Sequence, residues 1–353
     1  MNQEKKLLKF TKKGIYCPQG KFYLDPWYPV EKAVISHGHA DHARWGMSSY
    51  LCTHLSKNIL KHRLGKDINI QSLNYNEPIT INGVKVSFHP AGHVIGSAQI
   101  RLEYQGYVVV FSGDYKVKQD FITTPFEPQK CQTFITESTF GLPIYHWKTE
   151  KALQKELQNW VLNNQARQRT SVFLGYSLGK AQRLLSLLDG VDDIYVHRSI
   201  HHLNKAIQAS SFPLPKTKLW EANLTKKELQ NKIIIAPPAL LGSRMLKRLP
   251  NPATALCSGW MQIRGNRRWQ SVDAGFVVSD HADWKGLIKT VKATQAEQVY
   301  VTHGSQAVFS KYLNEIGINA KELKTEYGED ALSKIESEAA RLAERQEVEL
   351  EKK

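Results

Sequence analysis

The chain has 353 residues, of which 41% are hydrophobic and 10% aromatic, so it is long enough for two domains or for one domain with a large insertion. Residues 1–14 are rich in lysine but lack the apolar core of a signal peptide, and no apolar run reaches transmembrane length, so we expect a cytoplasmic protein. The cysteines have neither metal-binding nor redox spacing and are expected to be reduced: Cys17, Cys52, Cys131 and Cys257.

The formal net charge of +15 is concentrated in the middle of the chain. Residues 142–272 contain 20 Lys and Arg against 7 Asp and Glu, whereas the rest of the chain is nearly balanced. A positive field confined to one region indicates a polyanionic partner such as nucleic acid. A charge that serves only solubility is the alternative.

A dense group of metal-binding residue types follows the second strand expected near the N-terminus. Residues 21–24 form a strand that ends at Asp25, and the apolar run 32–36 leads into His37-Gly38-His39-Ala40-Asp41-His42. Imidazole and carboxylate groups suit zinc or a similar divalent ion. A solvated polar loop is the alternative, but so many unpaired ligands are wasteful without a cation.

The following strands repeat this design. Apolar or alternating runs at 83–89, 99–104, 107–111 and 133–136 predict strands. Polar residues stand shortly after three of them: His93, Asp114 and Glu137. Sites built in this way lie along one edge of a sheet, on loops that the strands hold in place.

From Thr149 the pattern changes to alternating helices and strands. Thr149 is expected to cap an amphipathic helix, and strands are expected at 171–175, 194–196 and 232–236. Helices are expected at 180–188, from Ser199 and from Leu240. This alternation predicts a mostly parallel α/β sheet, in the basic region and without an obvious ligand cluster.

Polar residues at strand ends return afterwards. An expected strand at 274–279 leads to His281, and one at 298–302 leads to His303. One domain interrupted by an insertion explains why the same pattern stands on both sides of a different block. Residues 333–353 are expected to form an exposed, charged helix.

Taken in order, these motifs resemble those of the metallo-β-lactamase superfamily, and more narrowly those of the β-CASP nucleases. The chain is most similar to the bacterial DNA-ligase-associated exonuclease group, through residues 176–183 and 258–260. The resemblance implies an α/β fold, a four-layer αβ/βα sandwich with an inserted α/β β-CASP domain. It places the catalytic domain at 1–140 and 273–353 and the nucleic-acid-binding insertion at 141–272.

The resemblance also implies two Zn²⁺ ions, although Mn²⁺ suits the same ligands. Its first ion is bound by His37, His39 and His93, and its second by Asp41, His42 and His303. Asp114 bridges the two ions, and Asp25 orients ligands from behind them. Asp41, Glu137 and His281 are the catalytic candidates.

His281 is the candidate for protonating the departing oxygen, with Glu137 fixing its tautomer. Two cations held close together can clamp the oxygens of a phosphodiester for in-line attack, which leaves this proton transfer to the protein. A satisfied structural histidine and a helix-capping carboxylate are the respective alternatives for these two residues.

Candidates for nucleic-acid contacts rest on softer signals. Lys180 opens a helix after a strand, where backbone amides meet phosphates. Basic side chains expected to track a backbone are Arg183, Arg264, Arg267 and Arg268. Trp260 and Trp269 suit base stacking or a buried core, and His197, His201 and His202 form a second histidine group that we interpret as surface.

The favoured function is a zinc-dependent phosphodiesterase that trims DNA ends in repair as an exonuclease, in functional association with a DNA ligase and a helicase. An RNA-processing nuclease of the same fold is the alternative, because His303 at the last ligand position is typical of the family's RNA-cutting members. A small-molecule hydrolase is disfavoured by the basic insertion. A non-catalytic binding module is disfavoured because every metal position is filled.

Overall fold

The computed structural model describes residues 7–191, 193–263 and 272–323. The described residues divide into two compact units, one of residues 7–119, 123–146 and 281–323 and the other of residues 120–122, 147–191, 193–263 and 272–280. The chain passes between the units at 146/147 and 280/281, and the domain boundaries at 140/141 and 272/273 stay a prediction. Within the first unit, Trp284 N donates to Tyr145 O and the ring of Phe140 packs edge-on against that of Tyr145.

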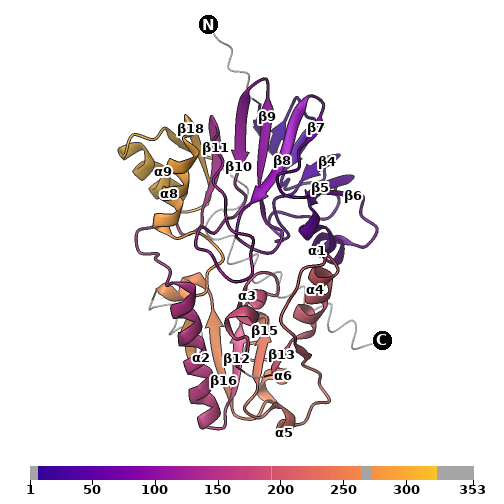
Figure 1. The fold of residues 1–353 in the computed structure, drawn as a ribbon, viewed down its shortest axis with the longest axis vertical. Helices are drawn as coiled ribbons and strands as arrows, with labels where there is room; N and C mark the ends of the chain where they lie inside the picture. Colours follow the sequence, from indigo (N-terminus) through magenta and orange to yellow (C-terminus); the bar gives the residue numbers. More distant parts are fainter. Residues whose placement is uncertain (1–6, 192, 264–271, 324–353) are drawn as a thin grey trace. The chain divides into compact units, whose positions relative to one another are not determined.

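The first unit contains two sheets (Figure 1). One has the order β1-β2-β3-β4-β5-β6, with β1 (Lys9–Thr11), β2 (Gly14–Cys17), β3 (Phe22–Leu24), β4 (Lys32–Val34), β5 (Ser49–Thr53) and β6 (Ile70–Leu73). The other has the order β19-β18-β11-β10-β9-β8-β7. Its strands are β7 (Ile79–Ile81), β8 (Val84–Pro90), β9 (Ala98–Tyr104), β10 (Tyr107–Phe111), β11 (Thr133–Ser138), β18 (Gln298–Gly304) and β19 (Ala320–Glu322).

Apolar side chains pack these elements into four layers. Leu24 and Val34 of the first sheet and Phe88 and Ile100 of the second belong to one buried cluster between the sheets. The helix α1 (His54–Leu64) covers the outer face of the first sheet, and α8 (Trp284–Thr294) and α9 (Gln306–Glu315) cover the outer face of the second. The expected αβ/βα sandwich is therefore confirmed.

The second unit is built on a sheet in which every pairing is parallel. Its order is β14-β13-β15-β12-β16-β17, with β12 (Thr170–Leu174), β13 (Ile194–Val196), β14 (Lys218–Leu219), β15 (Ile233–Ala236), β16 (Pro252–Cys257) and β17 (Ala274–Phe276). Its helical segments are α2 (Glu150–Ala166), α3 (Lys180–Leu187), α4 (Arg198–Gln208), α5 (Lys226–Leu229), η1 (Pro238–Leu240), α6 (Arg244–Lys247) and η2 (Gly259–Gln262). The expected parallel α/β sheet is present.

Local differences from the expected elements have local causes. Thr149 caps α2 as predicted, by accepting a hydrogen bond from Ala152 N. The helix expected from Leu240 is divided into η1 and α6, because Gly242 has φ +81° and Ser243 caps a new helix by accepting from Leu246 N. The strand expected at 274–279 ends at Phe276, and Val278 N bonds back to Phe276 O.

All four cysteines are buried and free, as expected for structural thiols. None of the helices in the described part of the chain is long and apolar enough to cross a membrane. The residues expected to form a terminal helix, 333–353, lie outside the described residues.

Candidate metal centre

The polar residues at strand ends converge at one edge of the first unit. Strands β10, β11 and β18 are parallel neighbours, so Asp114 just after β10 and Glu137 and His303 in the last residues of β11 and β18 lie at the same end of the sheet. Strand β8 is antiparallel to β9, which is antiparallel to β10, so β8 and β10 run in the same direction and His93 also follows on this side. Strand direction alone therefore brings together residues that are up to 210 positions apart, from His93 to His303.

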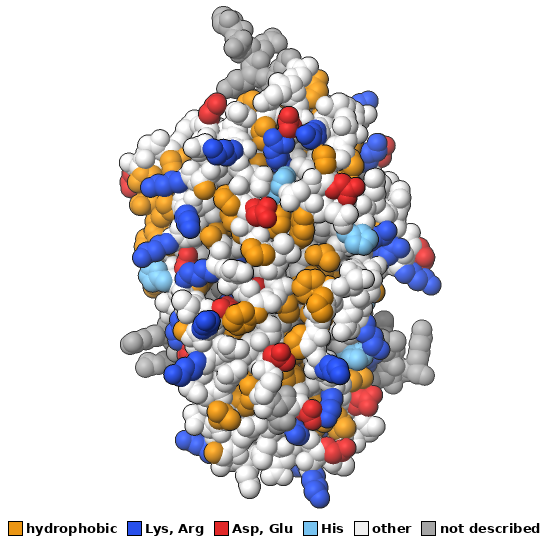
Figure 2. All heavy atoms as spheres, in the orientation of Figure 1, with side chains coloured by type: hydrophobic (Ala, Val, Ile, Leu, Met, Phe, Trp, Pro, Cys, Tyr) orange, Lys and Arg blue, Asp and Glu red, His pale blue; other side chains and the backbone are white. Residues whose placement is uncertain are grey.

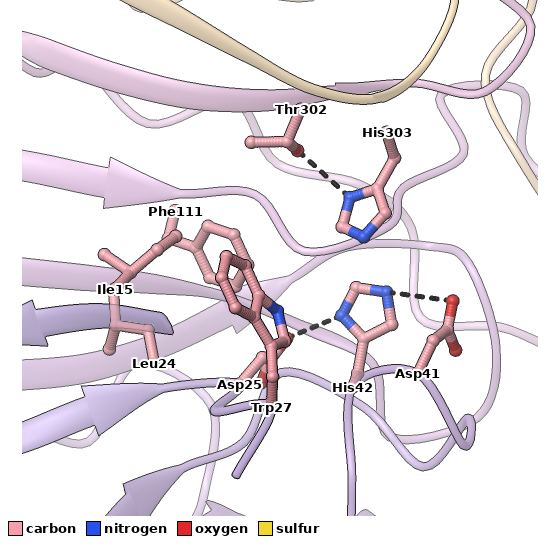
Figure 3. A pocket seen from close by; sticks show the side chains of 9 residues that line it. All are labelled: Ile15, Leu24, Asp25, Trp27, Asp41, His42, Phe111, Thr302 and His303. Atoms are coloured by element: carbon pink, nitrogen blue, oxygen red, sulfur yellow. Dashed lines mark hydrogen bonds and ion pairs between the residues drawn. The ribbon is translucent and has the colours of Figure 1, made fainter. Parts of the chain in front are cut away.

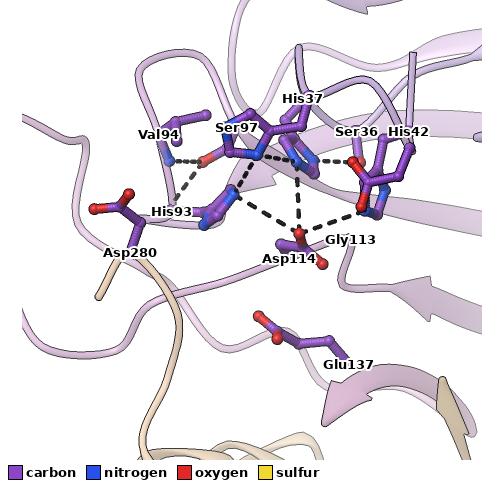
Figure 4. Close-up of polar contacts among 12 residues, drawn as sticks. Ser36, His37, His42, His93, Val94, Ser97, Gly113, Asp114, Glu137 and Asp280 are labelled. Carbon is purple, nitrogen blue, oxygen red and sulfur yellow. Dashed lines mark hydrogen bonds and ion pairs between the residues drawn. The ribbon is translucent and has the colours of Figure 1, made fainter. Parts of the chain in front are cut away.

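The imidazole rings of His37, His39 and His93 meet in the first group, and Figure 4 shows His37 and His93 beside Asp114. Nδ1 of His39 lies 3.1 Å from Nε2 of His37 and 3.0 Å from Nε2 of His93. Burial and the positive charges of neighbouring histidines lower the pKa of His37 well below its usual value. The ring is therefore neutral at neutral pH, which is the form that binds a metal ion.

Asp114 lies at the centre of the histidines. Its Oδ2 is 3.6 Å from Nε2 of His37, 3.4 Å from Nε2 of His42 and 3.7 Å from Nε2 of His93. Burial raises the pKa of the Asp114 carboxyl, but the adjoining His42 outweighs burial and holds it well below the usual value. One carboxylate oxygen thus faces imidazoles of both groups that the sequence predicted.

The backbone before Asp114 requires glycine. Gly113 has φ +54°, a conformation that side chains disfavour, and a Cβ placed there would lie 2.7 Å from both Cβ and Oγ of Ser36. Ala98 N donates to the carbonyl oxygen of Ser36, so the two sheets meet closely beneath the centre. The close approach of the Asp114 loop to the His37 loop depends on this missing side chain.

A second group is formed by Asp41, His42 and His303 (Figure 3). Nδ1 of His42 lies 2.7 Å from Oδ2 of Asp25, and its Nε2 is buried without a hydrogen-bond partner among the described residues. Burial lowers the pKa of His42, but the carboxylates of Asp114 and Asp41 outweigh it and hold the pKa well above its usual value. A proton on His42 therefore compensates part of the negative charge of Asp114 and Asp41, which a bound metal ion would otherwise compensate.

Asp25 organises this group from behind, and the sequence did not show how. It accepts hydrogen bonds from Ser36 N at 2.7 Å, from Ser36 Oγ and from His42 Nδ1. Ser36 Oγ also lies 3.0 Å from Nδ1 of His37, so one hydroxyl links Asp25 to both groups. The role of Ser36 is not predictable from the sequence, because a serine at a strand end has no distinctive signal.

The donor set fits divalent metal ions. Within each group, one ligand atom per residue lies within 4.8 Å of the others. The imidazoles of His37, His42 and His93 are at most 2% exposed, and the Nε2 of His42 is an orphaned buried atom. Buried nitrogen and oxygen donors in this arrangement are costly without a cation and suit zinc or manganese when one is present.

His281 and Glu137 form a separate pair beside the first group. Nδ1 of His281 lies 2.9 and 2.8 Å from Oε1 and Oε2 of Glu137, and Glu137 Oε1 accepts a hydrogen bond from Tyr115 N at 2.8 Å. The ring centroids of His281 and His93 are 4.6 Å apart. Asp114, Glu137 and His281 also place one ligand atom each within 4.8 Å of one another, so the pair adjoins the metal ligands directly.

The predicted nucleic-acid contacts are not exposed where the structure describes them. Lys180 and Arg183 are 7% and 6% exposed, and Arg183 pairs with Glu150 at 2.6 Å and with Asp280 at 3.7 Å. They stabilise the second unit internally, and this placement argues against tracking of a phosphate backbone. The remaining arginines, Arg264, Arg267 and Arg268, and Trp269 lie outside the described residues. Lys and Arg side chains are spread over the face in Figure 2 and do not form one continuous patch.

Other sequence candidates have structural roles. Trp260 is half-buried and packs against the apolar core of the second unit. His197 is buried and caps α4 by accepting from Ser199 N. Among the described residues, His201 and His202 join none of the potential metal-binding groups.

A contact missed in the sequence supports the metal-binding loop. Arg63 at the end of α1 donates a hydrogen bond from Nη1 to the carbonyl oxygen of Gly38, between His37 and His39. Lys118 likewise pairs with Asp283 at 2.9 Å, next to the His281 segment. Long-range contacts of this kind have no signal in the local sequence.

Comparisons with known proteins agree with this architecture. No family model matches the chain. It is 29% identical over 311 residues, 87% of its length, to a protein named Probable DNA ligase from Opitutus terrae. It is 36% identical over 125 residues to Endoribonuclease ysh-1 of Neurospora crassa and 26% identical over 183 residues to an RNase J-like protein of Methanocaldococcus jannaschii.

These matches are partial on the relatives' side. The chain spans 30%, 14% and 44% of the lengths of these three proteins. A crystal structure of a protein of unknown function from Enterococcus faecalis V583 superposes with a TM-score of 0.58 at 12% identity. That match covers 84% of this chain and 79% of the other, and it supports the fold alone.

Four observations point to the same protein family. They are the sandwich of two sheets, the parallel α/β unit that interrupts it, the order of the histidine and aspartate motifs, and these relatives. Together they indicate the β-CASP branch of the metallo-β-lactamase superfamily.

Proposed function

We propose that the protein is a metal-dependent nuclease that hydrolyses phosphodiester bonds of nucleic acids. The observation that carries this proposal is the position of Asp114, whose Oδ2 lies within 3.7 Å of three imidazoles, next to the hydrogen-bonded pair of His281 and Glu137. Such a site combines metal ligands with a group able to transfer a proton.

The ligand groups suit two ions, zinc in the first place and manganese as the alternative. We assign His37, His39 and His93 to the first ion and Asp41, His42 and His303 to the second, with Asp114 shared by both. Divalent ions held by these residues would polarise the phosphodiester and lower the pKa of water. Asp25 holds the tautomer of His42 so that Nε2 faces the centre.

His281 is assigned to the proton transfer. With Nδ1 held by Glu137, the opposite edge of the ring presents Nε2, and the carboxylate stabilises a positive charge on the imidazole. A protonated Nε2 can then donate to the departing oxygen of the substrate.

DNA is the favoured substrate, and trimming of DNA ends in repair is the favoured role. The match to the protein named Probable DNA ligase extends over 87% of this chain but only 30% of that protein. A ligase-named protein that carries a related segment supports functional association with a DNA ligase, and a helicase is the second partner we propose.

An RNA-processing nuclease is the second candidate. The identity to Endoribonuclease ysh-1 is higher, at 36%, although it covers only 34% of the chain. His303, which is buried against His42 with ring centroids 5.3 Å apart, completes a ligand group that this alternative also requires.

End-labelled single- and double-stranded DNA and RNA of one sequence, incubated with the metal-loaded protein, distinguish the candidates. The proposal predicts progressive shortening of DNA from an end, at a rate above that for RNA. Faster cleavage of RNA would favour the second candidate, and stability of all four substrates would contradict a nuclease.

A further inference from the structure

The first unit carries an exposed aromatic surface beside the candidate metal centre that none of the assigned roles uses. Trp45 is 74% exposed and Tyr28 is 44% exposed, whereas most large apolar side chains of this unit are buried. Trp45 stands three residues after His42, and Tyr28 three residues after Asp25. We call the segments 12–14, 26–29 and 44–46 together the aromatic surface.

Hydrogen bonds and close packing hold the three segments together. Arg44 Nη1 donates to Trp27 O at 3.0 Å, and Trp27 N donates to Lys13 O at 3.0 Å. A Cβ on Gly46 would lie 3.3 Å from Pro29, so these segments are in contact. The aromatic side chains are thus presented on a braced backbone, which reduces the entropy lost when a ligand binds.

The loop that carries Trp45 is also fixed from below. The hydroxyl of Tyr50 donates to Arg44 O at 2.8 Å and accepts from Met47 N at 3.1 Å. Tyr50 is itself buried, at 2% exposure. The exposure of Trp45 is therefore a feature of an ordered loop anchored on both sides of the residue.

This surface is continuous with the candidate centre. Trp27 lines the same pocket as Asp41, His42 and His303, and Figure 3 shows it next to Asp25 and His42. Trp27 therefore joins the aromatic surface to the lining of the second ligand group.

The charge of the surface suits a polyanion. Segments 12–14, 26–29 and 44–46 contain Lys12, Lys13 and Arg44 and no acidic residue. Both lysines are exposed, and Arg44 is half-buried. Aromatic faces interleaved with basic side chains are the combination that binds single-stranded nucleic acid, with bases stacked on the rings and phosphates near the cations.

We infer that the aromatic surface binds unpaired bases of the nucleic-acid strand, with Trp45 as the stacking platform, an inference that rests on the proposed nuclease function. Stacking is tolerant of sequence because every base has an aromatic face. It requires bases that are out of a duplex, so the surface would favour single-stranded or frayed ends.

The test is a double-mutant cycle in which Trp45 is substituted on the protein side and bases are removed on the substrate side. Trp45→Ala and Trp45→Phe are compared with the wild type on an oligothymidylate and on the same oligonucleotide with three abasic positions at the cleaved end. KM and kcat are measured from initial rates, and affinity is measured by fluorescence anisotropy. Tyr107→Ala is the matched control. It removes an exposed aromatic side chain at the start of β10, whereas Asp114 follows the other end of that strand.

Trp45→Ala should raise KM and Kd on the normal strand by roughly 5- to 150-fold, the range measured for base stacking. The kcat should change little, because stacking remote from the reacting phosphate contributes equally to ground and transition states. Trp45→Phe should recover most of the affinity, and metal content and Tm should match those of the wild type. The wild type should already bind the abasic strand more weakly than the normal strand. Trp45→Ala should bind the abasic strand with the same Kd as the wild type does.

Equal losses on normal and abasic strands, or no loss at all, would overturn the inference and assign this surface to another partner such as a protein. Because anisotropy does not require cleavage, the two proposals fail separately. If the protein cleaves normally but Trp45→Ala has the same effect on normal and abasic strands, only the stacking surface is rejected. Base-dependent binding through Trp45 without any cleavage rejects the nuclease and leaves the surface standing.

Discussion

Nδ1 of His42 lies 2.7 Å from Oδ2 of Asp25, and this contact leaves Nε2 of His42 buried, facing Asp114 at 3.4 Å. The contact fixes which nitrogen of the ring is available to the second ligand group. Asp25 is itself held by the backbone and hydroxyl of Ser36, so the orientation of His42 depends on a buried network.

Asp25→Asn should lower the affinity for the second metal ion by roughly 10- to 100-fold, the usual effect of a partner behind a metal ligand. The amide cannot supply the negative charge that favours the required tautomer of His42. Metal titration with a competing chelator measures the loss. Asp67→Asn, at an exposed position in the same unit, is the control and should bind as the wild type does. Unchanged affinity in Asp25→Asn would show that His42 is oriented by other contacts.

His281→Ala should reduce turnover by roughly 10²- to 10⁴-fold without loss of metal, because it removes a positioned proton donor. The defect should shrink on a nitrophenyl phosphodiester, whose leaving group departs without a proton. Initial rates on both substrates and metal analysis of the variant provide the measurement. A fall in metal content would identify His281 as a ligand, and retention of both properties would make it structural.

Gly113→Ala should destabilise the first unit and lower its metal content. The substitution combines the cost of a positive φ, about 1 kcal/mol, with a clash against Ser36 that must displace one of the two loops. Gly106→Ala is a matched control, since its φ is +80° and no atom lies within 4 Å of the added Cβ. Differential scanning calorimetry and metal analysis should show the larger loss for Gly113→Ala. Equal effects of the two variants would mean that the loops adjust freely.

Arg183→Ala should lower stability by about 3–5 kcal/mol, because it removes a buried cation that pairs with the carboxylates of Glu150 and Asp280. Arg167→Ala, at an exposed position of the same unit, should change stability by less than about 0.5 kcal/mol. Urea denaturation followed by fluorescence measures both. A loss of nucleic-acid affinity at full stability would restore the phosphate-binding role expected from the sequence.

The sequence alone predicted the strands that carry the site, because each is an apolar run that ends at a histidine or carboxylate. The placement of residues such as His93 and Asp114 was predictable only from the order of the motifs, since their local signals are weak. Ser36 and Arg63 were missed because their contacts join residues that are distant in the chain or chemically ordinary. The buried ion pairs of Lys180 and Arg183 could not be predicted, because the sequence does not show which side chains are enclosed around the parallel sheet.

The most direct test of the central claim is cleavage of an end-labelled DNA strand by the purified protein before chelation, after chelation, and after zinc or manganese is restored. Metal content is measured on the same samples, with Asp114→Ala in parallel. We expect about two ions per chain, loss of cleavage on chelation, recovery on reloading, and fewer ions with no cleavage in Asp114→Ala. Cleavage that persists in fully chelated protein, or a fully loaded protein that cleaves no nucleic acid, would contradict the account.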